Sequence, residues 1–359
     1  MSFDSSRSFL MSQRAADQRR NMHVFSFHFF PQVRLAGGLN LNRIHLTAKT
    51  FYRWLCLCHT LVTGEDLEAA VVLRKIQLAT VDVSFYSLAA IQGPPIPRDS
   101  LQLIQPGIYG IFSQDGTPFT SYVSSAVSFR TSFKAQEDEM VRSTKSPEFR
   151  AHNQIPMHLR TLAGARDRGK CFITGQTHLP TQCVWIIPPL ATFNGGLFDP
   201  MDLDKSKVVD NLITICSVLV DPFMHNLFSV DLEDNARIIV FDDLPSGVPT
   251  LPLRLPTLPS PASTDFWKSS FIVTLGNFFP AGELDEDGSR RTRSGNAGLL
   301  MEELHDDCAD LDDPKWQSDV GTEVVQVYMN LNLPSRRELL EEQAGDYGSE
   351  DEFVLSDDE

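Results

Sequence analysis

The uneven distribution of charge limits which part of this chain can form a folded core. Residues 281–359 hold 23 acidic and 6 basic residues, a net charge of −17, whereas residues 1–280 hold 24 acidic and 25 basic residues. A segment with so much like charge and so few aromatic residues buries too little apolar surface to offset the entropy lost on ordering it. The acidity is thus a property of a tail that we expect to be disordered, and the body of the chain is near neutral.

Composition narrows the class of protein further. The 359 residues are 42% hydrophobic, which is enough for two domains of ordinary size. Six cysteines are scattered without a pairing pattern, which favours a reducing compartment. No apolar run approaches the roughly 18–20 residues that a membrane-spanning helix needs, and no signal-peptide pattern opens the sequence. These features predict an intracellular protein, nuclear or cytoplasmic, without a membrane partner.

Local patterns predict a disordered N-terminus at 1–22, a small α+β region at 23–124 and a linker at 125–159. The linker prediction rests on a Ser, Lys, Arg and Glu-rich stretch with little periodicity, and a helix at 157–165 is expected to lead from it into the next module. Gly93-Pro-Pro-Ile-Pro97 interrupts the strand pattern. The elements expected in the α+β region are strands at 23–30, 81–86 and 106–112, a helix at 47–62 and a second helix from Thr63 through Leu67, Val71 and Ile76.

The second half divides at a proline-rich stretch. A compact module is expected at 160–243, and an extended connector at 244–262, because proline cannot donate to regular hydrogen-bond ladders. Further elements are expected at 263–330, beginning with a short helix or strand at 263–279. The last segment, 331–359, is predicted to be an acidic disordered tail.

Short motifs inside the 160–243 module carry the strongest functional signal. They are Arg166-Asp167, Cys171-Phe-Ile-Thr-Gly175, Val184-Trp-Ile-Ile-Pro188, Asn211-Leu-Ile213 and Leu227-Phe-Ser-Val-Asp231. Together they resemble the fungal branch of the HNH endonuclease family, over roughly residues 160–242. The resemblance implies an α+β protein with a ββα module, in which a β-ribbon and a helix surround one divalent metal ion, usually Mg²⁺.

In that family a histidine at the end of the first strand is the general base, an asparagine steadies it, and a histidine on the helix holds the metal. The matching positions in this chain are Trp185, Asn211 and Val220. Indole offers neither a basic nitrogen nor a lone pair for a metal. The resemblance therefore implies that Asn211 survives as a catalytic-site residue without the base it would serve, and fold and cleavage must be argued separately.

Two interpretations of the helix position remain open. In a rival register, His225 is the metal ligand, which requires an insertion of five residues and a compensating loss. In the simpler interpretation, His225 is an ordinary polar residue after the helix. A working nuclease would need Mg²⁺ and an unusual ligand set, such as His225, Asp221 and Asp231.

Three basic residues stand at the entrance of the module. Arg166, Arg168 and Lys170 are candidates for contacts with nucleic-acid phosphates, or they form a solvated entrance to a strand. The acidic tail could imitate a phosphate backbone and contact this basic face within the same chain.

Three functions are consistent with these features. The first is an HNH-domain protein that has lost catalysis and acts as a nucleic-acid or protein-binding module. The second is an active divalent-metal-dependent endonuclease with non-standard ligands. The third is an acidic interaction protein in which nucleic acid plays no part.

Overall fold

The computed structural model describes residues 13–27, 31–63, 71–82, 85–119, 132–144, 147–191 and 203–280, with short pieces between 303 and 329. The chain divides into two compact units. One comprises Met1–Thr80 and Phe85–Thr292, and the other comprises Val81–Ser84 and Arg293–Glu359. The first unit combines helices with antiparallel sheets, which confirms the α+β class. All structural statements below concern the residues that the structure describes.

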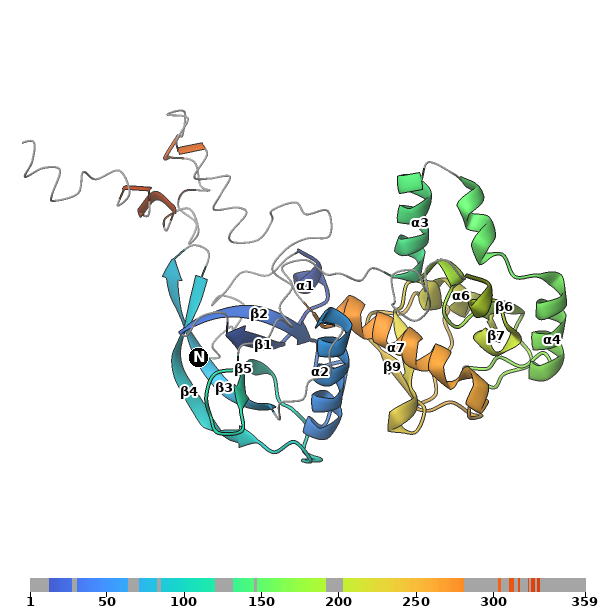
Figure 1. Ribbon diagram of the computed structural model, residues 1–359, viewed down its shortest axis with the longest axis horizontal. Helices are drawn as coiled ribbons and strands as arrows, with labels where there is room; N and C mark the ends of the chain where they lie inside the picture. Colours follow the sequence, from blue (N-terminus) through green and yellow to red (C-terminus); the bar gives the residue numbers. More distant parts are fainter. Residues whose placement is uncertain are drawn as a thin grey trace, which may run out of the picture. The chain divides into compact units, whose positions relative to one another are not determined.

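Five strands close into a barrel in the order β1-β2-β4-β3-β5 (Figure 1). The strands are β1 (Met22–Phe27), β2 (Gln32–Leu39), β3 (Val71–Asp82), β4 (Phe85–Ile96) and β5 (Gly107–Ser113). β1 pairs antiparallel with β2 and parallel with β5, and this second pairing closes the barrel. Closure leaves no unpaired edge strand.

Helix α2 (Ala48–Thr63) confirms the helix that periodicity predicts at 47–62. Its first turn is capped by the Thr47 hydroxyl, which accepts a hydrogen bond from the Thr50 backbone N–H at 3.2 Å. Phe51, Trp54, Leu55 and Cys58 recur on one helical stripe and are all buried.

Three local predictions in the N-terminal half are wrong. The helix predicted through Val71 and Ile76 is the strand β3, whose backbone pairs with β5. These two side chains lie an odd number of positions apart, so they face opposite sides of the strand and join different hydrophobic clusters. Residues 64–70 lie outside the described part. The strand predicted at 81–86 straddles the end of β3 and the start of β4. β4 also continues to Ile96 through the predicted breaker, with Gly93 at φ 75°.

Two segments predicted to lack structure contain helices. Within 1–22, α1 (Gln13–Asp17) buries Ala15, and β1 already begins at Met22, whereas residues 1–12 lie outside the described part. Within 125–159, α3 (Phe133–Thr144) and the 3-10 helix η2 (Pro147–Asn153) replace much of the predicted linker, whereas α4 (Met157–Asp167) confirms the helix expected at 157–165. Phe133 is buried and its N–H donates to Asn226 Oδ1 at 2.8 Å, which anchors α3.

A two-stranded ribbon and a helix follow α4. β6 (Thr181–Trp185) pairs antiparallel with β7 (Leu212–Cys216), and α6 (Ser217–Met224) begins directly after β7. This strand–strand–helix order is the order that the resemblance implies. A second ribbon and short helices complete this half: β8 (Phe228–Asp231), β9 (Arg237–Val240), η3 (Leu203–Ser206), η4 (Val209–Asn211), η5 (Leu232–Asp234) and η6 (Pro261–Ser263).

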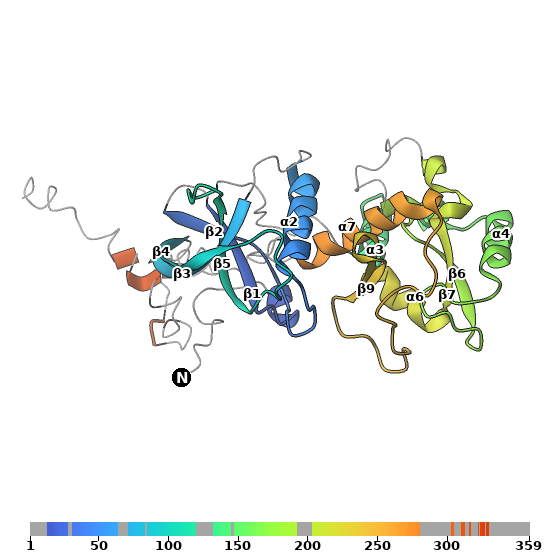
Figure 2. The same ribbon diagram turned by 90° about the horizontal axis from the view of Figure 1, so that it is seen from below.

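Helix α7 (Thr264–Phe278) is shared between two hydrophobic clusters. Its C-terminal half, with Phe271 and Leu275, packs with the barrel-side cluster that includes α2. Its N-terminal half, with Phe266 and Trp267, packs with the ribbon-side cluster. Both views show α7 beside α2 and extending toward the β6–β7 ribbon (Figures 1 and 2).

The end of α7 is fixed to β2 by a close backbone approach. Gly38 N–H donates to the Phe279 carbonyl at 2.8 Å. A Cβ at Gly37 would lie 2.3 Å from that same oxygen, so only glycine fits there. Among the described residues, no helix has the length and apolar character needed to cross a membrane.

Candidate functional site

The Arg166-Asp167 motif clamps the start of β7. Arg166 donates to both carboxylate oxygens of Asp167, at 2.7 and 3.1 Å, and to the carbonyls of Val209 (3.0 Å) and Leu212 (2.5 Å). Asp167 Oδ2 in turn accepts the Thr214 N–H at 2.8 Å. The structure therefore engages Arg166 in holding the ribbon, and this residue differs from the other two predicted phosphate-binding residues.

The Cys171–Gly175 motif forms a tight turn on the edge of the ribbon. Gly175 has φ 72°, and its N–H donates to the Cys171 carbonyl at 2.7 Å. Phe172 N–H donates to the Thr214 carbonyl at 2.7 Å, which attaches the turn to β7. The glycine is needed because its φ lies in the left-handed region.

Asn211 is buried and all its polar atoms have partners. Its Nδ2 donates to the carbonyls of Ile187 and Ser206, both at 2.9 Å, and its Oδ1 accepts the Ile187 N–H at 3.0 Å. The side chain ties the segment after β6 to the residue before β7. The predicted catalytic-site asparagine is thus a clamp on the ribbon.

Trp185 occupies the position where the resemblance implies a general base. It is 4% exposed and packs with Leu159 and Ala163 of α4 and with Leu212 of β7. Its Nε1 donates to the Asn153 carbonyl at 2.7 Å. An indole that donates its only N–H in this way cannot accept a proton from water.

Trp185 and Val220 lie in different clusters. Val220 of α6 packs with the cluster that also holds Val184, the neighbour of Trp185 on β6. Successive side chains of a strand point to opposite faces, so Val184 faces α6 whereas Trp185 faces α4. The two positions that the resemblance assigns to one metal site are therefore not brought together.

The alternative metal ligands are not gathered either. His225 follows α6, and its Nδ1 lies 3.0 Å from the Asp221 carbonyl and 3.3 Å from Asp221 Oδ1. Asp231 is buried elsewhere, where it accepts hydrogen bonds from Arg53 and from Trp54 Nε1 (2.9 Å). Within the described ranges, no group of three or more His, Cys, Asp or Glu side chains could hold a metal ion.

Two cysteines in this half, Cys183 and Cys216, do not offer a ready nucleophile. Burial raises the pKa of the Cys183 thiol, and burial together with the neighbouring Cys171 thiol raises that of Cys216. A raised pKa keeps a thiol protonated at neutral pH, and only the thiolate is strongly nucleophilic. Covalent catalysis by these groups is therefore disfavoured.

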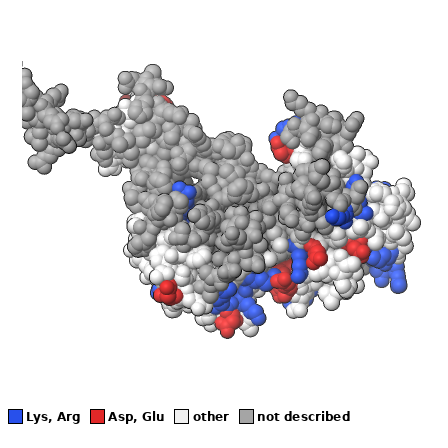
Figure 3. Space-filling model, viewed as in Figure 1, with Lys and Arg blue, Asp and Glu red and all other residues white. Residues whose placement is uncertain are grey.

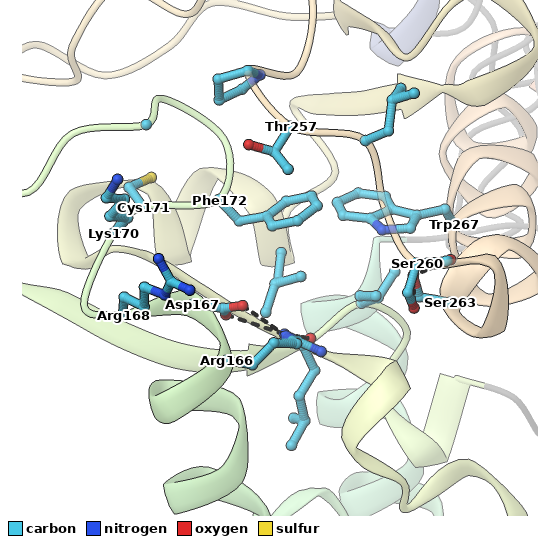
Figure 4. Close-up of a pocket in the computed structure, with 16 residues that line it drawn as sticks. Arg166, Asp167, Arg168, Lys170, Cys171, Phe172, Thr257, Ser260, Ser263 and Trp267 are labelled. Atoms are coloured by element: carbon cyan, nitrogen blue, oxygen red, sulfur yellow. Dashed lines mark hydrogen bonds and ion pairs between the residues drawn. The ribbon is translucent and has the colours of Figure 1, made fainter.

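A pocket of about 440 Å³ lies between the loop after α4 and helix α7 (Figure 4). Ile186, Leu212 and Ile213 line it with apolar surface. Phe172 stacks on Trp267, with ring centroids 5.8 Å apart and an interplanar angle of 20°, and both rings line the pocket. Its volume falls within the range of roughly 300–1,000 Å³ that is typical of ligand pockets.

Two positive charges at this pocket are uncompensated. Arg166 and Asp167 neutralise each other, whereas Arg168 and Lys170 are exposed and make no side-chain hydrogen bond or ion pair with the described residues. Arg168 ends α4 with φ 53° and ψ 36°, a left-handed conformation that is costly for a residue with a Cβ. Two of the three basic residues singled out in the sequence, Arg168 and Lys170, thus lie at the edge of the pocket.

Trp267 supplies a polar group that sequence reasoning missed. The side chain is fully buried, and its Nε1 has no hydrogen-bond partner among the residues that the structure describes. The nitrogen-bearing edge of the ring is turned toward Ser260 and Ser263 at the pocket (Figure 4). A buried N–H without an acceptor is unfavourable, so this group favours a ligand or water that accepts from it.

A second, larger hollow of about 780 Å³ is lined by α2, β9 and the segments next to them. Most of its cations are paired: Arg53 with Glu233 at 3.1 Å, and Arg237 and Arg254 with Asp234 at 3.4 and 4.0 Å. Figure 3 shows the same intermixing of signs on the face in view, where basic and acidic side chains alternate. This hollow therefore offers less free positive charge than its composition suggests.

The candidate site consists of a clamped ribbon and the pocket beside it. The motif residues build a ribbon held by Asp167 and Asn211, beside a pocket with two free cations, an aromatic pair and an unpaired indole N–H. Comparison of the chain with protein families, with curated proteins and with solved structures gives no match.

Proposed function

We propose that this chain is a nuclease-like protein that binds nucleic acid without cleaving it, through Arg168 and Lys170. The observation that carries the proposal is a pair of cations, Arg168 and Lys170, that have no partner among the described residues. They lie beside a strand–strand–helix module whose positions 185 and 220 hold no base and no metal ligand. The motif resemblance to HNH endonucleases supports nucleic acid as the ligand class.

Hydrolysis needs a group that activates water and a metal that stabilises the phosphate. The Trp185 N–H is used by the Asn153 carbonyl, and Asn211 is used by Ile187 and Ser206. His225 lies beside Asp221, and the structure places Asp231 elsewhere. These contacts favour a binding role over a hydrolytic one.

Binding through two cations should be weak and sensitive to salt. Each neutralised phosphate releases counterions, so two contacts predict a slope of log K against log salt of about −2. Fluorescence anisotropy of the full chain with labelled single-stranded and duplex oligonucleotides, at several salt concentrations, measures both affinity and slope.

The decisive variant is Arg168→Glu with Lys170→Glu, since both side chains are exposed and unpaired. We expect this variant to lose oligonucleotide binding. Arg160→Glu is the matched control, because Arg160 is an exposed arginine on α4 outside the pocket. Binding that is absent in the native chain, or that is equal in native and double variant, contradicts the proposal.

Plasmid nicking with Mg²⁺ or Mn²⁺ tests the absence of cleavage. We expect no nicking. Nicking that EDTA stops and that His225→Ala abolishes would instead establish an active endonuclease with non-standard ligands.

A protein ligand is the second candidate. It is favoured by the apolar lining of the pocket and by Leu258 at the pocket, which is 72% exposed. If the chain binds no nucleic acid but binds a peptide specifically, a protein ligand is the better candidate. That result would support the third function, an acidic interaction protein.

A further inference from the structure

We infer that the pocket between the loop after α4 and α7 binds an acidic peptide with apolar side chains, and that residues 350–359 of this chain have the sequence it takes. The inference does not depend on nucleic-acid binding. It uses the apolar lining and the Trp267 N–H, neither of which a phosphate backbone requires.

The first argument is the apolar lining. Ile186, Leu212 and Ile213 present apolar surface to the pocket, and Leu258 extends that surface outward because it is 72% exposed. Burying a peptide's apolar side chain against these residues removes both surfaces from water. A pocket of about 440 Å³ has room for more than one such side chain.

The second argument is the unpaired indole N–H. Trp267 Nε1 is buried without a partner in the described part of the chain, while the nearby Ser260 hydroxyl already contacts Asp210 Oδ1 (3.3 Å) and Ser263 Oγ (3.2 Å). A peptide carbonyl or carboxylate that reaches the pocket supplies the missing acceptor. The same donor would gain nothing from a purely apolar ligand.

The third argument is charge. Arg166 and Asp167 cancel, which leaves Arg168 and Lys170 as two free positive charges at the pocket. An apolar peptide would leave both charges unmatched. A peptide whose apolar residues are flanked by carboxylates satisfies the lining and the cations together.

The occupant follows from the chain's own sequence. Residues 350–359 read Glu-Asp-Glu-Phe-Val-Leu-Ser-Asp-Asp-Glu, with six acidic residues around three adjacent apolar ones and no basic residue. Two other acidic stretches hold apolar residues. One surrounds Leu304, which is itself buried in the structure, and the other, Glu338-Leu-Leu-Glu-Glu342, follows two arginines. The segment at 350–359 therefore matches the pocket best.

The test is made in trans with a labelled synthetic peptide of residues 350–359. The receptor is the full chain carrying Phe353→Asp and Leu355→Asp, so that its own copy of the segment does not compete. We expect saturable binding by fluorescence anisotropy. Adding Arg168→Glu and Lys170→Glu should weaken it by roughly tenfold or more, whereas adding Arg160→Glu should leave it unchanged.

Two further receptor variants probe the pocket itself. Trp267→Phe removes the N–H and should weaken peptide binding by roughly threefold to tenfold. Since Trp267 is buried, its folding is checked by circular dichroism. Leu258→Asp alters an exposed residue that folding does not need and should also weaken binding, so the inference stays testable if Trp267→Phe fails to fold.

Two altered peptides complete the experiment. One has Ser in place of Phe353, Val354 and Leu355 and keeps every charge; the other has amides in place of the carboxylates. We expect both to lose binding. Equal binding of the serine peptide, absence of binding by the native peptide, or binding that ignores the pocket variants overturns the inference. Oligonucleotide binding is measured separately, so either proposal can fail without the other.

Discussion

Two arginine–aspartate pairs in this molecule have different roles. Asp231 is 1% exposed and accepts from Arg53 and from Trp54 Nε1, so it joins β8 to α2 across a long sequence separation. Arg53 also contacts Glu233 at 3.1 Å. Arg166 and Asp167 are neighbours in sequence and jointly hold the start of β7.

The two pairs differ in whether the neighbouring cationic side chains are matched by carboxylates. Around Arg53, the arginines of the adjoining hollow are largely matched by Glu233 and Asp234. Around Arg166, Asp167 pairs with Arg166 itself, so Arg168 and Lys170 have no carboxylate partner among the described residues. Positive residues at a pocket therefore indicate a ligand only when the local carboxylates do not already match them.

The largest loss of stability is expected at the buried Arg53–Asp231 pair. Asp231→Ala leaves the Arg53 guanidinium and the Trp54 N–H without their acceptor, and should lower the free energy of unfolding by about 3–5 kcal/mol. Urea unfolding followed by circular dichroism measures the loss. Glu233→Ala, at the exposed end of the cluster, is the control and should cost less than about 1 kcal/mol. Equal losses in these two variants would contradict a larger contribution from the buried carboxylate.

Asn211→Ala tests a neutral clamp on the same ribbon that Asp167 holds. The Ile187 N–H and the carbonyls of Ile187 and Ser206 lose a buried partner, so we expect a loss of about 2–3 kcal/mol in the same unfolding measurement. Oligonucleotide affinity in the folded protein should not change. A loss of affinity at unchanged stability would instead give Asn211 a direct role in binding.

Asp167→Ala should cost less than Asp231→Ala, about 1–2 kcal/mol, because the Arg166–Asp167 pair is partly exposed to solvent. The substitution also releases a positive charge beside Arg168 and Lys170. We therefore expect oligonucleotide affinity to rise while stability falls, as measured by anisotropy and urea unfolding. A fall in both would mean that the pair positions the binding loop.

The smallest changes in stability are expected at Arg168 and Lys170, the two cations of the pocket. Arg168→Gly relieves a left-handed backbone at φ 53° and should raise the free energy of unfolding by about 0.5–1 kcal/mol. The same change removes one cation, so oligonucleotide affinity should fall. Lys170→Ala is the comparison, with no backbone strain to relieve; its stability should stay within about 0.5 kcal/mol of the native chain. A stabilised Lys170→Ala would show that charge repulsion, not backbone strain, is relieved.

Sequence patterns predicted the elements whose signals are local. The helix at 47–62 follows from one apolar stripe, and its residues are buried as expected. The segment beginning at Val71 was misassigned because β3 places apolar residues on both of its faces, which leaves no alternation to indicate a strand, and only its pairing with β5 shows the strand. The helix α3 was missed because Phe133 is its main apolar anchor in a charged stretch.

The candidate site was predicted in part for a similar reason. The motif located Arg166 and Asn211, but their roles depend on partners such as Leu212 and Ile187, which only the folded chain brings near. Trp267 has no motif at all and reaches Phe172 from a distant helix. The sequence alone does not distinguish a cationic side chain that is paired with a carboxylate from one that is unpaired.

The shared position of α7 has a consequence for synthesis of the chain. The barrel strands and α2 leave the ribosome first, yet Trp54 packs against Phe271, and Gly38 bonds to the Phe279 carbonyl. Those partners are made more than two hundred residues later. The N-terminal half must therefore wait, with part of its apolar surface uncovered, until α7 emerges, and in that interval it is most exposed to aggregation and to chaperones.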